Sequence, residues 1–432
     1  MEVSKNLNIR HLNHITEEDV KIIVKKCGFT SDEISIKDYT VNIASNKMLG
    51  FLSDYWKLKV HLSINEVENK VLCFFIKAVS KTNAAKANMV KEMNLFKKEI
   101  FFYTVLKEKM MVPGLKPWSA IFVTSLDEAM VLEDLDTLHY KSCDKFLRFD
   151  TPHTLRALET LARFHASSII LESRKSKILG RPYIIHNEFE QFLDQGGYKE
   201  TDIWFQQCLN GALEAVKSYS KYSTDKYIRQ IESNWTNIWL SALSLSNFSS
   251  KYKNVICHRD LWNNNILFHY EKVDETLLPD NCVMVDFQAI RCQPPAGDVM
   301  LLLYCNLDPT FREENMNMFL SYYYKALKII LETWDISISD ILTEKEFLQS
   351  AEEQRLWGLV VCACLIPQFW INEDLTTEVF TDTARFEDIM SKDKDPSIYN
   401  LKFWTKDAKL WSLWKLFGAG QCCCLLCFVN KI

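Results

Sequence analysis

Two aspartates and one asparagine stand at spacings that suit phosphoryl transfer. Asp260 follows His258 in the stretch VICHRDLWNNNILF, and Asn265 lies five residues after Asp260. Asp286 ends the apolar run of NCVMVDFQA. Phosphoryl transfer needs a carboxylate that orients a hydroxyl and accepts its proton, and oxygen ligands for the Mg²⁺ that bridges the phosphates. The pattern therefore predicts a phosphotransferase site.

Lys77 is a cation of the kind that such a site needs for nucleotide phosphates. It stands in the middle of LCFFIKAVS, on an apolar strand face. Removing an unpaired ammonium from water is costly, so we expect an acidic partner nearby. Glu99 is the best candidate because it borders the apolar face of a helix predicted over residues 88–107, and Glu92, one heptad earlier, is the alternative.

The surrounding pattern predicts a strand-rich first part and a helical second part. Period-two alternation favours strands over residues 35–44, 55–64, 70–80, 119–125 and 128–135. Apolar residues at three- and four-residue intervals favour helices over residues 17–26, 88–107, 153–172, 204–219, 227–243, 316–334 and 346–365. We therefore expect an α+β fold with a nucleotide-binding lobe over 1–134, a larger helical catalytic and substrate lobe over 135–415, and a cysteine-rich tail over 416–432.

The composition argues against several other classes of protein. With 432 residues, of which 48% are hydrophobic and 25% charged, the chain is long enough for two lobes and resembles an average globular protein. A formal net charge of −5 without a dense basic stripe argues against a nucleic-acid partner. The start lacks an apolar signal region, and the longest apolar run, Leu356–Trp370, is too short to span a bilayer. We therefore expect no transmembrane segment and a cytoplasmic protein.

Several stretches together resemble the ecdysteroid kinase-like family, also called CHK kinase-like, which is related to choline kinases and aminoglycoside phosphotransferases. The stretches HRDLWNNN and VDFQA are similar to the family signature His-Gly-Asp-Leu-Trp-x-Asn-Asn followed by Asp-Phe-Gln. The stretches FFIKA, FKKEIFFY, VLEDL, LARFHASS and PAGDVMLLLY extend the resemblance over residues 40–370. It implies a bilobal protein-kinase-like fold and a small-molecule kinase that uses ATP and Mg²⁺.

The resemblance also implies a role for each part of the site. It implies Asp260 as the catalytic base, Asn265 and Asp286 as the Mg²⁺ ligands, Lys77 as the phosphate clamp with Glu99 as its partner, and the backbone from Glu133 to Leu135 as the adenine-binding segment. The substrate would then be a small molecule that offers a hydroxyl group.

The sequence departs from the family pattern at two positions. Arg259 replaces the usual glycine between His258 and Asp260, and we expect this to place a bulky cation beside the base. The phosphate loop has only Gly50, in SNKMLGFLSDYW, and lacks the G-x-G-x-x-G pattern. The loop pattern leaves open whether nucleotide affinity depends more on Lys77 and the metal than on the glycine loop.

Two other classes of protein compete with a small-molecule kinase. HRDLWNNN also satisfies the catalytic-loop pattern of protein kinases, but only eleven residues separate Asp286 from Asp298 and no A-P-E follows, which leaves little room for an activation segment. A catalytically silent binding module with this fold is the other alternative, motivated by Arg259 and the weak glycine loop. The presence of Lys77 and Asp260 argues against it.

The acceptor is predicted to be a bulky, largely apolar molecule such as an ecdysteroid-like steroid or a xenobiotic. Ten of the twelve tryptophans, from Trp204 to Trp414, fall in the helical part and could line an apolar pocket, although most are expected to be core. The resemblance supports this acceptor class. The rival is a cationic substrate such as choline or an aminoglycoside, attracted by the acidic run NEDLTTEVFTDTARFED.

Four further features have structural interpretations. His165 is interpreted as a core histidine that is hydrogen-bonded near the catalytic loop, and Asp298 as the cap of a helix that begins after Gly297. Cys362 and Cys364 are interpreted as helix core. The tail cysteines Cys422, Cys423, Cys424 and Cys427 allow three interpretations. An apolar tail packed on the helical lobe is favoured over S-acylation, which would give weak membrane association, and over a zinc site.

Overall fold

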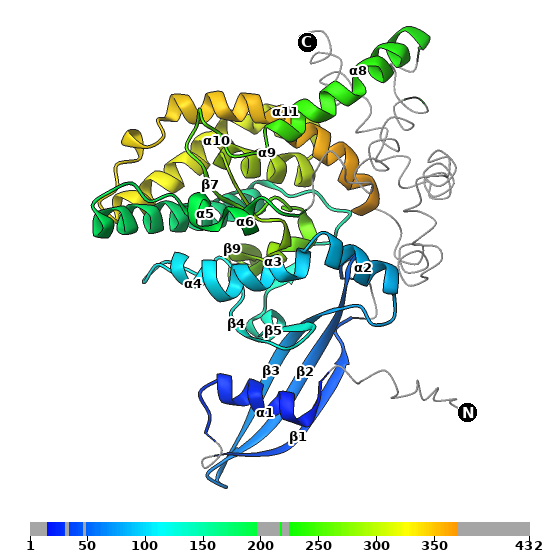
Figure 1. Ribbon diagram of the computed structural model, residues 1–432, viewed down its shortest axis with the longest axis vertical. Coiled ribbons are helices and arrows are strands. Elements are labelled where there is room, and N and C mark those ends of the chain that lie inside the picture. Colours follow the sequence, from blue (N-terminus) through cyan, green and yellow to red (C-terminus); the bar gives the residue numbers. More distant parts are fainter. Residues whose placement is uncertain (1–14, 31–33, 46–48, 197–216, 218–223, 370–432) are drawn as a thin grey trace.

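The computed structural model describes residues 15–30, 34–45, 49–196, 217 and 224–369. A twisted antiparallel sheet forms one end of the molecule and a helical body forms the other (Figure 1). The sheet has the order β1-β2-β3-β5-β4, with bounds Ile34–Ile43, Ser53–Ile64, Glu68–Val79, Ala129–Glu133 and Phe122–Ser125 in that order. Helix α1 (Glu17–Lys26) packs on this sheet through a small apolar core. The expected α+β fold with a strand-rich first lobe is confirmed.

The helix between β3 and β4 is broken, whereas the sequence predicted one continuous helix over residues 88–107. The structure has α2 (Ala84–Glu92), α3 (Leu95–Phe101), a π-helical turn (Phe102–Leu106) and α4 (Lys107–Met110). The break occurs at Asn94, which has a left-handed backbone with φ of 53°. Asparagine tolerates this conformation, and an α-helix cannot continue through it.

The helical body surrounds a buried central helix, α9 (Pro295–Asn306), of which every residue is buried. Three helices pack against it: α5 (Thr151–Leu179), α10 (Pro309–Glu332) and α11 (Glu344–Phe369). Helix α8 (Asp225–Ser244) packs on α11, and α6 (Ile185–Leu193) lies beside α3 (Figure 1). The helices predicted over 153–172, 227–243 and 346–365 are present and extend beyond those bounds. The helix predicted over 316–334 is α10, which begins earlier and ends at Glu332, and α6 was not predicted. The predicted helix 204–219 apart from Lys217, the acidic run and the tail cysteines lie outside the described residues.

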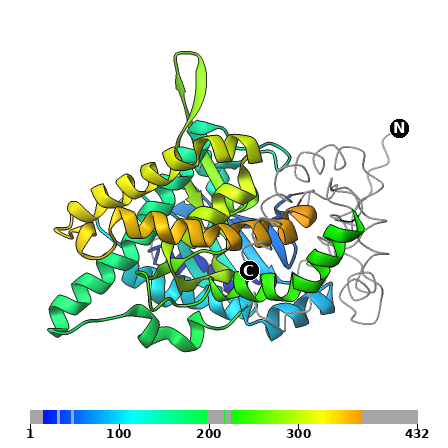
Figure 2. The same cartoon turned by 90° about the horizontal axis from the view of Figure 1, so that it is seen from above.

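Two small sheets carry the functional loops. Strands β7 (Val255–Cys257) and β10 (Arg291–Gln293) pair with each other, and β8 (Ile266–Val273) pairs with both β6 (Lys141–Ser142) and β9 (Thr276–Met284). The β8–β9 hairpin projects from the body (Figure 2). The loop from β7 to β8 contains Asp260 and Asn265, and β9 leads into Asp286, so the two small sheets bring these residues toward one cleft.

Helix α3 and the π-helical turn that follows it pack against the helical body. The rings of Phe102 and Phe287 stack with centroids 4.1 Å apart, and α3 shares the large core of the helical lobe. Consequently the helix that carries Glu99 is fixed to the segment that carries Asp286. Among the described residues, no helix is long and apolar enough to cross a membrane.

Candidate active site

A cavity of about 330 Å³ lies between the sheet and the helical body. Its lining comes from β2, β3, α3, the segment after β5 and the two ends of the β8–β9 hairpin. The residues with expected roles that line it are Lys77, Glu99, Glu133, Leu135, Asn265 and Asp286. Asp260 is not part of the lining but is hydrogen-bonded to Asn265, so the fold brings all seven predicted site residues to one place.

Lys77 bridges two carboxylates on the floor of this cavity. Its Nζ lies 2.6 Å from Glu99 Oε2 and 2.7 Å from Asp286 Oδ1. The other oxygen of Glu99 accepts a hydrogen bond from the Phe287 backbone N–H at 3.1 Å. Glu99, and not Glu92, is therefore the partner of the lysine. Glu92 ends the preceding helix, on the other side of the break at Asn94.

The cluster is buried, and its charges depend on one another. Burial alone would lower the pKa of Lys77, but the charges of Asp286 and Glu99 outweigh it and hold that pKa well above its ordinary value. Burial raises the pKa of the Glu99 carboxyl, and the ammonium of Lys77 opposes that rise. The lysine is thus a fixed positive charge that faces the cavity.

Asn265 lies between the predicted base and the predicted metal position. Its Nδ2 donates to the backbone oxygen and to Oδ2 of Asp260, both at 2.9 Å. Because these bonds use both amide protons, the carbonyl oxygen Oδ1 of Asn265 remains as the atom that can accept a cation. Asp286 has a second carboxylate oxygen beyond the one that contacts Lys77. Carboxylate and amide oxygens are the donor set that Mg²⁺ prefers, so these residues fit the metal that the sequence predicts.

Asp260 has an environment that favours proton transfer near neutral pH. Burial and, to a smaller extent, the charge of Asp286 raise the pKa of Asp260 to about 8. The hydrogen bond from Asn265 and the charge of Lys77 oppose this rise. A general base is most effective when its pKa lies near the working pH.

A neutral histidine connects the two loops of the site, and the sequence had marked His258 only as part of the motif. His258 Nδ1 accepts from the Asp260 backbone N–H at 3.2 Å, and Nε2 lies 2.9 Å from the Val285 carbonyl oxygen. Burial lowers the pKa of His258, so the ring is neutral, with its proton on Nε2. The imidazole therefore fixes Asp260 relative to the strand end that carries Asp286.

Asp298 supports the catalytic loop from behind and was wrongly predicted as a helix cap. Helix α9 begins at Pro295, so Asp298 lies inside its first turn. Its carboxylate accepts from the backbone N–H groups of His258 at 2.6 Å and Arg259 at 2.9 Å. This contact joins residues forty positions apart, which local helix signals cannot reveal.

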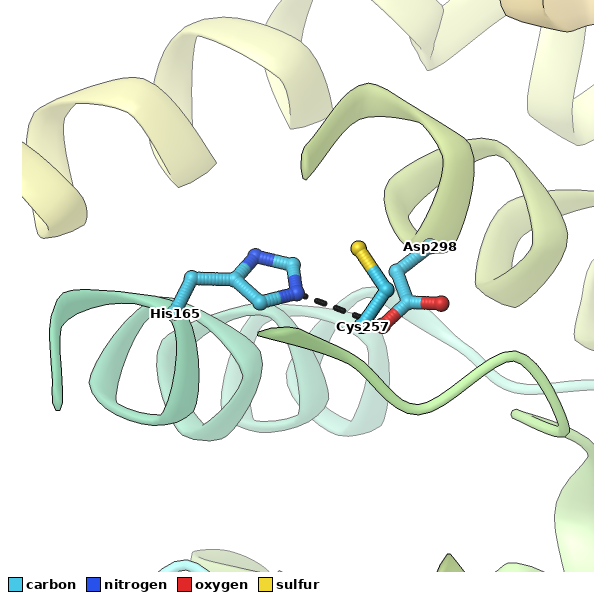
Figure 3. Close-up of side chains that lie close together, drawn as sticks. All are labelled: His165, Cys257 and Asp298. Carbon is cyan, nitrogen blue, oxygen red and sulfur yellow. Dashed lines mark hydrogen bonds and ion pairs between the residues drawn. The ribbon is translucent and has the colours of Figure 1, made fainter. Parts of the chain in front are cut away.

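His165 completes this support, as the sequence indicated for a core histidine. Its Nε2 lies 3.2 Å from Asp298 Oδ2, and its Nδ1 lies 2.6 Å from the Tyr323 hydroxyl. Cys257 lies beside the pair (Figure 3). Its sulfur lies within 4.8 Å of a ring nitrogen of His165 and of a carboxylate oxygen of Asp298. Because the carboxylate already accepts from the loop backbone, we interpret this group as a buried hydrogen-bond network.

Arg259 does not stand beside the base as expected. Its backbone is left-handed, with φ of 69°, a conformation that glycine adopts without strain. The side chain is 1% exposed and runs into the helical body. There it donates to Ser246 Oγ at 3.1 Å, and its guanidinium carbon lies 5.4 Å from the centre of the Trp357 ring. The departure from the family glycine therefore leaves the cavity clear.

The predicted phosphate loop contains one close approach. A Cβ atom added to Gly50 would lie 2.3 Å from the Tyr55 hydroxyl oxygen, so only glycine fits without a shift of the tyrosine. Tyr55 lines the cavity and is paired with Lys77 across β2 and β3. Burial raises the pKa of Tyr55, so its hydroxyl stays neutral.

The segment after β5 closes the other end of the cavity. Glu133 accepts from the Ile121 backbone N–H at 2.6 Å through its side chain, so its expected role would fall to its backbone. Lys57 contacts both Asp134, at 3.1 Å, and Asp136. This ion-pair group ties β2 to the segment that contains Leu135.

The family comparison agrees with this geometry. The model of the ecdysteroid kinase-like family matches residues 47–335, which include Gly50, Lys77, Asp260 and Asp298. The match spans more than half of the chain. The protein belongs to the ecdysteroid kinase-like family.

Ecdysteroid kinase-like proteins are small-molecule kinases, and solved structures similar to this member include three other kinases. An ethanolamine kinase from Plasmodium vivax has 12% identity and a TM-score of 0.42, over 85% of this chain and 82% of that one. Aminoglycoside 2'-phosphotransferase-IIIa, in a GDP complex, has 13% identity and a TM-score of 0.35, over 91% of this chain and 98% of that one. A glucosamine kinase in complex with glucosamine, ADP and phosphate has 12% identity and a TM-score of 0.33, over 87% of this chain and 84% of that one. No curated protein matches the chain.

Proposed function

We propose that this protein transfers the γ-phosphate of ATP to a hydroxyl group on a bulky, largely apolar small molecule. The observation that carries the proposal is the position of Lys77, which bridges Glu99 and Asp286 on the floor of the cavity beside Asn265 and Asp260. The cluster joins a cation, three carboxylates and an amide at one cleft. Phosphoryl transfer requires such a group, because positioning and electrostatic stabilisation supply most of its catalysis.

Different residues would bind different parts of the nucleotide. Lys77 would contact the phosphates, and the backbone from Glu133 to Leu135 would contact adenine. Asn265 and Asp286 would hold Mg²⁺, which neutralises charge on the phosphates when bound. Lys77 is positioned for this role by Glu99, which is anchored to the Phe287 backbone.

Asp260 would act on the acceptor. Asn265 fixes one carboxylate oxygen, Oδ2, and His258 fixes the backbone of the same residue. The other oxygen, Oδ1, would orient the acceptor hydroxyl and accept its proton as the new oxygen–phosphorus bond forms. A cation bound at Asp286 would offset the charge that raises the pKa of Asp260, so the carboxylate would be ionised and able to accept the proton.

The acceptor class is inferred from the aromatic groups beside the base. Trp262, two residues after Asp260, stacks on Phe51 of the phosphate loop with centroids 6.0 Å apart and planes 29° apart. Both residues lie close to residues of the site in the chain. Phe51 is half-buried and Trp262 is 6% exposed, so the pair supports an apolar acceptor as an apolar border beside the base and not as an open surface. Other tryptophans of the helical lobe, such as Trp239 and Trp357, are buried core and do not argue for a pocket.

Purified protein incubated with labelled ATP and a panel of hydroxylated compounds tests the function. We expect transfer that requires Mg²⁺, is lost in Asp260→Asn and favours ecdysteroids and plant phenolics over choline and aminoglycosides. A preference for the cationic compounds that weakens at high salt would overturn the apolar acceptor and favour the rival class. ATP binding without transfer to any compound would favour a silent binding module.

A further inference from the structure

A second cluster of reactive side chains lies at the edge of the nucleotide cavity. Cys143 directly follows β6, Asp150 and His153 lie at the start of α5, and Tyr270 is on β8. Asp150 Oδ1 lies 2.6 Å from His153 Nδ1, and His153 Nε2 lies 3.0 Å from the Tyr270 hydroxyl oxygen. That oxygen lies 3.5 Å from Cys143 Sγ. The four groups therefore form one connected chain that ends at a thiol.

The imidazole in this chain is held in one orientation. Asp150 contacts the ring and also caps α5 by accepting from the His153 backbone N–H at 3.0 Å. The ring of His153 meets Phe268 edge to face at 4.9 Å and lies 6.1 Å from the Phe149 ring. The aromatic contacts fix the ring plane, so Nε2 is directed at Tyr270.

The protonation of these connected side chains directs a hydrogen-bond donor toward the sulfur. Burial alone would lower the pKa of His153, but the nearby sulfur of Cys143 and the carboxylate of Asp150 outweigh burial and raise it to about 9. At neutral pH both ring nitrogens then carry protons, so Nε2–H donates to the Tyr270 oxygen. Burial raises the pKa of Tyr270, so its hydroxyl keeps its proton and can donate it to the sulfur. A nearby cation and a hydrogen-bond donor both stabilise a thiolate.

We propose that Cys143 is a nucleophilic thiol that takes soft electrophiles at the rim of the nucleotide cavity. Cys143 is half-buried, and its neighbour Ser142 lines the cavity. With an α,β-unsaturated carbonyl compound, the sulfur would form a bond to the β-carbon. The displaced electron pair would move to the α-carbon, which takes a proton relayed from His153 through Tyr270. The adduct adds bulk beside Ser142, and this link to nucleotide binding rests on the proposed function.

Alkylation of the full-length protein with iodoacetamide tests the thiol. At pH 7, peptide mass spectrometry would give the rates at Cys143 and at Cys27, an exposed thiol whose pKa burial raises. We expect Cys143 to react about tenfold faster than Cys27, despite its lower exposure, because the Tyr270 hydroxyl lies 3.5 Å from its sulfur and His153 stands directly behind that hydroxyl. Equal rates at the two cysteines, or a faster Cys27, would overturn the proposal.

Two variants separate the relay from simple accessibility. We expect His153→Asn and Tyr270→Phe each to slow alkylation of Cys143 severalfold and to leave Cys27 unchanged. Tyr270→Phe keeps the ring and removes only the hydroxyl, so it tests the relay even where His153→Asn impairs folding. The Cys27 rate and the melting temperature report an intact fold. An unchanged Cys143 rate in well-folded Tyr270→Phe would show that the chain of contacts does not activate the thiol.

ATP titration before and after alkylation tests the coupling to the cavity. We expect alkylation to weaken ATP binding severalfold in the wild type and to have no effect in Cys143→Ser, which lacks the thiol. Unmodified protein that fails to bind ATP would contradict the proposed function and not the reactive thiol. Protein that binds ATP equally well before and after modification of Cys143 would overturn the coupling.

Discussion

The two walls of the cleft hold their functional groups by different means. On the sheet side, Lys77 is held by charge, through Glu99 at 2.6 Å and Asp286 at 2.7 Å. On the helical side, the loop with Asp260 is held through its backbone, which donates to the buried carboxylate of Asp298. Charge contacts at the first wall face a ligand, whereas hydrogen bonds at the second wall fix the shape of a loop. Loss of the first kind should therefore affect binding, and loss of the second kind should affect folding.

The largest expected effect is on the reaction itself, at Asp260→Asn. The amide keeps the shape of the side chain and can still present its carbonyl oxygen to Asn265 Nδ2. It cannot take up the proton of the substrate hydroxyl. We expect kcat to fall by about 10²- to 10⁴-fold, as for loss of a general base, with the melting temperature unchanged. Steady-state kinetics and thermal melting check this. A variant with nearly wild-type turnover would exclude Asp260 as the base.

The next largest effect should be on stability, at Asp298→Ala. The variant leaves the backbone N–H groups of His258 and Arg259 buried without their acceptor, which should lower the free energy of unfolding by about 3 kcal/mol or more. Urea titration measures this free energy.

Asp308→Ala is the matched control, because Asp308 also accepts from two backbone N–H groups but at the half-buried start of α10. There we expect a loss of only about 1 kcal/mol, typical of a helix cap. Similar losses in the two variants would contradict the contrast between a cap and a loop support.

A third test compares the two proposed metal ligands. Asp286→Ala should weaken Mg²⁺-dependent ATP binding more than Asn265→Ala, by about tenfold, because a charged ligand contributes more to a hard cation than a neutral carbonyl does. Calorimetric titration with ATP, with and without Mg²⁺, measures the difference. Equal or reversed losses would mean that other residues hold the metal.

A fourth test concerns coupling within the charged wall. Lys77→Met and Glu99→Gln should have strongly non-additive effects on ATP binding, with a coupling energy of about 1–3 kcal/mol, as expected for contacting residues. A double-mutant cycle from ATP titrations gives this energy. Additive losses would show that the ion pair does not position the lysine.

The smallest expected effect is at Tyr55→Phe, which removes the hydroxyl that lies against Gly50. We expect ATP affinity to fall by less than about tenfold, the value of one neutral hydrogen bond. Gly50→Ala should cost more, since the new methyl group displaces the tyrosine. The two dissociation constants can be compared directly. A larger loss in Tyr55→Phe than in Gly50→Ala would reverse our interpretation of the loop.

Local patterns predicted the charged wall better than its support. Lys77 and Glu99 could be matched from the sequence because strand and helix periodicity place each on a defined face. The break at Asn94 was missed, since a single left-handed residue leaves the apolar spacing unchanged. The role of Asp298 was also missed, because a carboxylate that accepts from a distant backbone leaves no trace in spacing. The direction of the Arg259 side chain likewise depends on a helix about a hundred residues away.

The left-handed arginine has a consequence for how this site can change in evolution. Glycine needs no partner at this position, whereas an arginine there costs about 1 kcal/mol in backbone strain and must find a place for its guanidinium. Here Ser246 and Trp357 supply that place. The three positions should therefore vary as a set among relatives. A chain with glycine in the loop can dispense with the hydroxyl and the ring, and a chain with arginine has to retain them.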